Sequence, residues 1–120
     1  MIIRYASNDP ANAGFNVELY LEGDWPTYLG SRAEGRLMGL YMLGWGGGTT
    51  DAIFTLQPVL HSRNDKGDGD YNWGNYKDPE FDALIDAAKG EVDAKKRQDL
   101  INKAMQRHHD MVYHIPLHLQ

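Results

Sequence analysis

The sequence predicts an α/β fold, a mixed β-sheet packed with helices, and three observations support this prediction. Strand-like apolar stretches occupy the first part of the 120-residue chain, a short helical stretch lies between two of them, and two amphipathic helical stretches follow a polar loop. A strand, a helix and a second strand in that order form a right-handed βαβ unit whose helix packs on the sheet. The length suits a single domain over residues 1–120.

Three strands and one helix are expected before the glycine-rich stretch of the chain. Residues 2–6 form a short strand closed by a turn. Residues 15–21 alternate apolar and polar side chains, which is the period of a half-buried strand. Residues 36–45 are apolar on both faces, as is typical of a central strand. Between these two strands, a proline in the first turn predicts a short helix over residues 24–35.

Two helices are expected in the C-terminal part of the chain. Asp78 is a natural N-cap for the first helix, which ends at Gly90, and Asp93 caps the second. The apolar face of the first helix consists of Phe81, Leu84, Ile85 and Ala88. The apolar stripe of the second consists of Leu100, Ile101, Ala104, Met105, His108, Met111 and Val112. Pro116 then forces the final residues into an extended segment.

The polar, glycine-rich loop at residues 61–75 raises the question of a calcium site. In an EF-hand register starting at Asn64, Lys66 stands where an acidic or amide ligand belongs, and Asn75 stands where the bidentate glutamate belongs. We therefore expect a solvated loop without calcium.

Composition excludes several classes of function. The net charge is −5, and the densest basic cluster is Lys95–Arg97, so we expect no nucleic-acid partner. No apolar run has the length of a membrane span, residues 1–10 lack the apolar core of a signal peptide, and cysteine is absent.

Catalysis and cofactor binding are not expected either. His114 and His118 fall on the same side of an extended segment, as a zinc pair would, but the chain has no H-E-x-x-H pairing. It also has no G-x-S-x-G elbow, and its glycine-rich stretch lacks the spacing of nucleotide-binding loops. The sequence thus predicts a protein that is not an enzyme, with no cofactor and no metal.

Several motifs occur in a distinctive order along the chain. They are a strand ending in Gly44-Trp45, a loop carrying Asp51, the helix start within Asn75–Leu84, Asp93 followed by Lys96-Arg97, and Ile115-Pro116-Leu117. From Asn16 onward this order resembles the C-terminal lobe of the family 5 extracellular solute-binding proteins. These are the dipeptide- and oligopeptide-binding components of bacterial ABC importers. The resemblance implies a periplasmic-binding-protein-like (class II) lobe.

The resemblance also implies that the loop after Trp45 lines a ligand cleft between two lobes. In this family an Asp three residues after the Trp pairs with the ligand's α-ammonium, and here that position is Gly48. The residues expected to bind the ligand are Trp45, Gly46, Gly47, Gly48, Thr49 and Asp51, with Tyr71 and Trp73 bordering the cleft. Glycines allow close backbone approach, and Trp45 offers a flat surface for stacking. Alternatively, the glycines only form a tight strand exit and Trp45 belongs to the core.

The implied function is that of a substrate-binding component of an ABC importer for peptide or another small solute. The expected partners are the solute, the membrane permease and a first lobe that is not in this sequence. The parent protein is expected to be periplasmic or lipid-anchored outside the cytoplasm. In this family a helix joins the strands that match residues 2–6 and 15–21, but the interval Ser7–Gly14 is shorter than a parallel crossover needs. Either the two strands do not pair as in the family, or a helix is missing there, and we expect the second. The alternative is a free-standing protein-interaction domain with the same topology.

Overall fold

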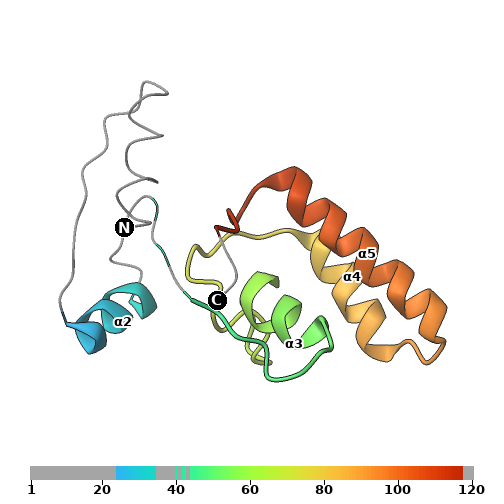
Figure 1. The fold of residues 1–120 in the computed structure, drawn as a ribbon, viewed down its shortest axis with the longest axis horizontal. Coiled ribbons are helices and arrows are strands. Elements are labelled where there is room, and N and C mark those ends of the chain that lie inside the picture. Colours follow the sequence, from blue (N-terminus) through green and yellow to red (C-terminus); the bar gives the residue numbers. More distant parts are fainter. Residues whose placement is uncertain (1–23, 35–39, 41, 43, 118–120) are drawn as a thin grey trace. The chain divides into compact units, whose positions relative to one another are not determined.

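The chain divides into two compact units, Met1–Leu37 and Met38–Gln120, and the computed structural model describes residues 24–34, 40, 42 and 44–117. The helices of these described residues are α2 (Trp25–Ala33), α3 (Ile53–Thr55), the π-helical turn η1 (Leu56–Leu60), α4 (Pro79–Gly90) and α5 (Ala94–Met111), as Figure 1 shows. None of them combines the length and the apolar character that crossing a bilayer requires.

The predicted α/β fold is wrong, because the described part of the chain consists of helices and loops without a strand. The strand expected over residues 36–45 is described only in part, and Gly44 and Trp45 at its end have no regular structure. Leu40 is 83 % exposed and Met42 is 43 % exposed, whereas a central strand buries both faces. The strands expected over residues 2–6 and 15–21 lie outside the described residues, as does the interval Ser7–Gly14.

The short helix predicted in the first unit is confirmed as α2. The carboxylate of its N-cap, Asp24, accepts a hydrogen bond from the backbone N–H of Thr27 at 3.0 Å. The Trp25 ring stacks on Tyr28 with 5.6 Å between centroids. These contacts all lie within one or two turns, so the helix is specified by its own sequence.

Helix α4 in the second unit begins and ends where the sequence predicts. The Asp78 carboxylate accepts a hydrogen bond from the backbone N–H of Phe81 at 3.2 Å, which satisfies a free donor of the first turn. The Nε of Arg107 on α5 also lies 2.8 and 2.7 Å from the two oxygens of this carboxylate. Asp78 is 3 % exposed, so one buried side chain both caps α4 and joins it to α5.

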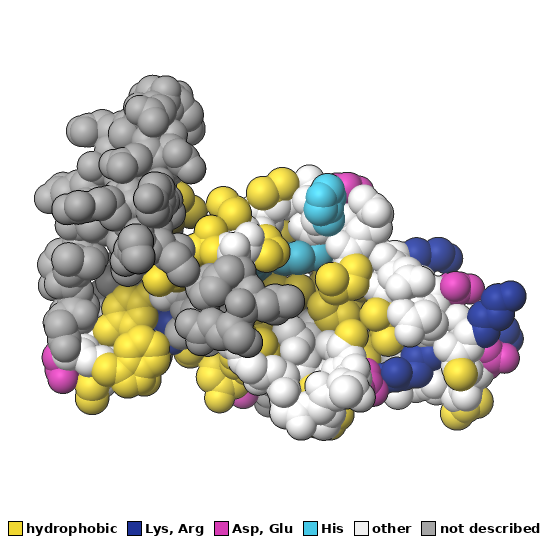
Figure 2. Space-filling model, viewed as in Figure 1, with side chains coloured by type: hydrophobic (Ala, Val, Ile, Leu, Met, Phe, Trp, Pro, Cys, Tyr) yellow, Lys and Arg dark blue, Asp and Glu magenta, His cyan; other side chains and the backbone are white. Residues whose placement is uncertain are grey.

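Helix α5 starts after the predicted N-cap Asp93, whose carboxylate accepts a hydrogen bond from the Lys96 N–H at 2.9 Å. Its predicted apolar stripe is only partly correct. Ile101 and Ala104 are buried against α4, whereas Met105 is 47 % exposed. Met111 and Val112 at the C-terminal end of the stripe are exposed as well. Acidic and basic side chains lie next to one another at the end of Figure 2 where α4 and α5 are joined.

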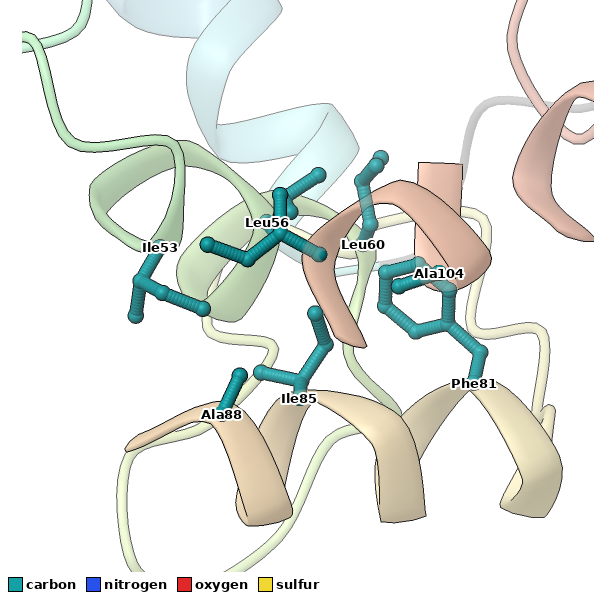
Figure 3. Close-up of a cluster of buried hydrophobic side chains, with 8 residues drawn as sticks. Ile53, Leu56, Leu60, Phe81, Ile85, Ala88 and Ala104 are labelled. Carbon is teal, nitrogen blue, oxygen red and sulfur yellow. The ribbon is translucent and has the colours of Figure 1, made fainter. Parts of the chain in front are cut away.

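A helical segment that the sequence did not predict, α3 with η1, completes the core. The N–H of His61 donates to the carbonyl of Leu56 at 3.1 Å, which closes a wide π-type turn. The buried side chains of this segment point toward those of α4 and α5 (Figure 3). The core consists of Ile53, Leu56, Leu60, Phe81, Ile85, Ala88, Ile101 and Ala104.

The loop at residues 61–75 is solvated in part, as expected: residues 63–67 are exposed, whereas a few of its side chains are packed into the protein. Asp68 and Asn72 are buried, and the Asn72 amide donates to the carbonyls of His61 and Tyr76 at 3.0 Å each. Gly69 has a φ of +67°, and a Cβ built there would lie 2.3 Å from the His61 carbonyl oxygen. This loop is therefore held by backbone contacts that only a glycine permits.

Candidate functional site

Three of the predicted site residues come together as an aromatic cluster, defined as Trp45, Tyr71 and Trp73. The ring centroids of Trp45 and Tyr71 lie 5.0 Å apart, and those of Tyr71 and Trp73 lie 5.3 Å apart in an edge-to-face arrangement. Trp45 is 41 % exposed and Tyr71 is 45 % exposed. Such contacts between rings favour a fixed arrangement, so the cluster presents an ordered apolar surface to solvent.

The glycine loop, residues 46–48, adjoins the aromatic cluster. The indole N–H of Trp45 donates to the Thr55 hydroxyl at 3.2 Å, which fixes the start of the loop against α3. A Cβ at Gly47 would lie 3.3 Å from the Thr55 hydroxyl oxygen, whereas Gly46 and Gly48 have open space around them. All three glycines are exposed. The loop thus offers backbone groups to a ligand without covering them with side chains.

Asp51 and Thr49 shape the loop through contacts within the protein. The Asp51 carboxylate accepts a hydrogen bond from the Ile53 N–H at 3.0 Å, and one guanidinium nitrogen of Arg97 lies 3.1 and 2.7 Å from its two oxygens. The hydrogen bond from Ile53 and then the one from Arg97 hold the pKa of Asp51 below its ordinary value. The Thr49 hydroxyl accepts a hydrogen bond from the Asp51 N–H at 3.1 Å. Asp51 therefore links the loop to α5.

The comparisons with known proteins identify no relative. No family model, no curated protein and no solved structure matches this chain. The contacts, burial and charges of the described residues are therefore the basis for the function proposed below.

A second group of candidate side chains was missed by the sequence analysis. It lies between the loop at residues 61–75 and α4, and we call it the His61 cluster: His61, Asp68, Asp86 and Lys89. The Lys89 ammonium lies 3.1 Å from a carboxylate oxygen of each aspartate. Although burial opposes ionisation, hydrogen bonds from Asn64, Lys89 and Gln57 lower the pKa of Asp68 to about 2. The usable sequence signal was Asp86 and Lys89 three residues apart on a helix that faces an acidic loop.

Two histidines near the C-terminal end of α5 form an aromatic group with two tyrosines. The Tyr76 and Tyr113 rings stack with 4.1 Å between centroids, and the His108 and His114 rings lie 5.2 Å apart. His118, the expected partner of His114 in a zinc pair, lies outside the described residues. Burial lowers the pKa of both His108 and His114. The neighbouring His114 lowers the pKa of His108 further, whereas the Asp78 carboxylate acts in the opposite direction and raises it.

These two histidines are expected to make the free energy of unfolding fall as the pH is lowered below about 7. Because their folded-state pKa values lie below the ordinary value of about 6.5, the unfolded chain binds more protons over this range. The stability is therefore fully present above the unfolded pKa and is lost as the pH falls toward the folded one. Urea unfolding at about pH 7.5 and about pH 5 measures the loss.

A variant combining His108→Gln and His114→Gln should show a smaller difference between the two pH values. His109→Gln is the matched control, because the side chain of His109 is 82 % exposed. An equal pH dependence in the double variant and the parent chain would contradict the assignment.

Proposed function

We propose that this chain is part of the substrate-binding component of an ABC importer, and that it contributes the aromatic cluster and the glycine loop to a site for peptide or another small solute. One observation carries the proposal: Trp45 and Tyr71 remain 41 % and 45 % exposed while their rings are in contact beside a loop without side chains. Because the exposed rings are already held in place, a solute that binds against them causes little further loss of side-chain entropy. The motif order from Gly44-Trp45 onward supports the same assignment.

The chemistry of the surface favours uncharged parts of a solute. Gly48 stands where a carboxylate would pair with a ligand ammonium, and the Asp51 carboxylate is engaged by Arg97. The rings offer apolar surface, and the exposed loop offers backbone N–H and carbonyl groups for hydrogen bonds. We therefore propose recognition by stacking and backbone hydrogen bonds. The first lobe of the parent protein would form the opposite wall, and the membrane permease would receive the solute outside the cytoplasm.

An NMR titration of the isotopically labelled chain with uncharged-capped dipeptides, free dipeptides and monosaccharides tests this proposal. We expect a bound solute to shift the indole N–H signals of Trp45 and Trp73 and the amide signals of the glycine loop. Trp45→Ala should weaken that binding by about tenfold or more, because it removes one of the two exposed rings.

Trp25→Ala is the matched control, since Trp25 is a 58 % exposed tryptophan in α2 of the other unit. It should leave the affinity unchanged. Shifts confined to the exposed face of α5 would contradict the proposal and favour the protein-interaction domain instead.

A further inference from the structure

The His61 cluster has the donor atoms of a metal site. One ligand atom each of His61, Asp68 and Asp86 lies within 4.8 Å of the others. His61 and Asp68 are each 4 % exposed, and Asp86 is exposed at the rim. The donors come from the end of η1, from the following loop and from α4, so the fold and not the local sequence brings them together.

The imidazole of His61 is oriented with one nitrogen bound and the other open. Its Nδ1 lies 2.7 Å from the Ser62 carbonyl oxygen, which only accepts hydrogen bonds, so Nδ1 carries the proton of the neutral ring. Its Nε2 is buried without a hydrogen-bond partner, 3.7 Å from an Asp86 oxygen. A lone pair that faces a carboxylate is repelled by it, and either a proton on Nε2 or a cation bound between the two groups relieves that repulsion. A metal-bound histidine commonly donates its second N–H to a backbone carbonyl in this way.

Lys89 already supplies one positive charge at this place. Its ammonium lies 3.1 Å from oxygens of both Asp68 and Asp86, yet it neutralises only one of the two carboxylates. The Lys89 side chain is 33 % exposed and flexible, so it can withdraw into solvent. A divalent cation in its place would neutralise both carboxylates and also bind the open Nε2, for which an ammonium is no ligand.

We propose that His61, Asp68 and Asp86 form a site for a divalent transition-metal ion, with Zn²⁺ as the best match, in competition with the Lys89 ammonium. One imidazole nitrogen and two carboxylate oxygens with a fourth position open are a donor set that suits Zn²⁺. Calcium and magnesium favour oxygen ligands only. This inference goes beyond the proposed solute-binding function and does not depend on it, because the metal ligands are not residues of the proposed solute site. The bound metal would join the loop at residues 61–75 to α4.

The test is a Zn²⁺ titration of the purified chain, freed of metal by a chelator and carrying no histidine tag. We expect one equivalent to bind and to raise the melting temperature, and a chelator to reverse the effect. His61→Asn and Asp86→Asn should each weaken binding more than about a hundredfold, as loss of a direct ligand exceeds the usual cost of losing a supporting contact. Lys89→Met should strengthen it by roughly tenfold, because no ammonium has to be displaced.

His109→Asn is the matched control, since that histidine is 82 % exposed and belongs to no part of the cluster. Asp86→Asn keeps the test valid if His61→Asn fails to fold, because the Asp86 side chain is 58 % exposed. Nitrogen NMR should show the metal on Nε2 of His61 with the proton retained on Nδ1. Zn²⁺ binding that Asp86→Asn leaves unchanged, or an absence of binding by both the parent chain and Lys89→Met, would overturn the proposal.

Discussion

Replacing Phe81 with alanine is expected to lower the free energy of unfolding by about 3–5 kcal/mol. The Phe81 ring is 2 % exposed and lies in the core between α4, η1 and α5, so its removal leaves a cavity that three elements line. The cost combines the lost transfer of the ring from water with that cavity. Urea unfolding followed by circular dichroism measures the change, and the variant should unfold at a much lower urea concentration.

Phe54→Ala is the matched control for Phe81→Ala. Phe54 lies in α3 close to the same core but is 59 % exposed, so the same chemical change should alter the free energy of unfolding by less than about 1 kcal/mol. Equal losses in the two variants would contradict the core described above.

Gly69→Ala is expected to destabilise the second unit by about 2–4 kcal/mol, with two causes that add. The φ of +67° is unfavourable for any residue with a Cβ, and the new Cβ would lie 2.3 Å from the His61 carbonyl oxygen. The atoms that the new Cβ would meet are backbone atoms of His61, Ser62 and Arg63, which have no alternative rotamer. Urea unfolding again measures the loss, and the amide signals of the loop at residues 61–75 should broaden or shift in NMR spectra.

Two glycine variants separate these causes. Gly67→Ala tests the conformation alone, because Gly67 has a φ of +90° and its nearest atom is 3.7 Å away on the Asp70 side chain. Gly48→Ala tests neither, since nothing lies within 4 Å and its φ is not positive. We expect the order Gly69→Ala, then Gly67→Ala, then Gly48→Ala in decreasing cost. A different order would contradict the close approach to His61.

The helices that the sequence predicted correctly are those with local signals at their ends. Asp78 and Asp93 each bond a backbone N–H three residues onward, and Asp24 does the same for α2. An N-cap acts within one turn, so its effect is visible in a short stretch of sequence. The spacing of Phe81, Ile85 and Ala88 correctly predicted the buried face of α4 because the helical period alone decides it.

The predicted sheet failed because a strand depends on partners elsewhere in the chain. An apolar run such as residues 36–45 fits a central strand, but Leu40 and Met42 are exposed. The helical segment α3 with η1 was missed for a related reason: its short apolar run carries Pro58 and is bounded by polar residues.

The candidate site was predictable only in part. The sequence placed Trp45, Tyr71 and Trp73 near one ligand surface through the family resemblance, and the structure puts their rings in contact. It did not reveal that Asp51 binds Arg97, because those residues are far apart in the chain and meet only after α5 has packed. The His61 cluster escaped for the same reason, as Asp86 and Lys89 come from a helix and Asp68 from a loop.

The open surroundings of the glycine loop affect how this protein can diverge. A Cβ built at Gly46 or Gly48 meets nothing within 4 Å, so mutation can introduce side chains there without disturbing the core. Gly47 is more restricted, because a Cβ there would press on Thr49 and Thr55. Homologues are therefore expected to vary at the first and third glycine and to retain the second. Substitutions at these two positions would change the exposed surface of the loop while the helices that support it remain unchanged.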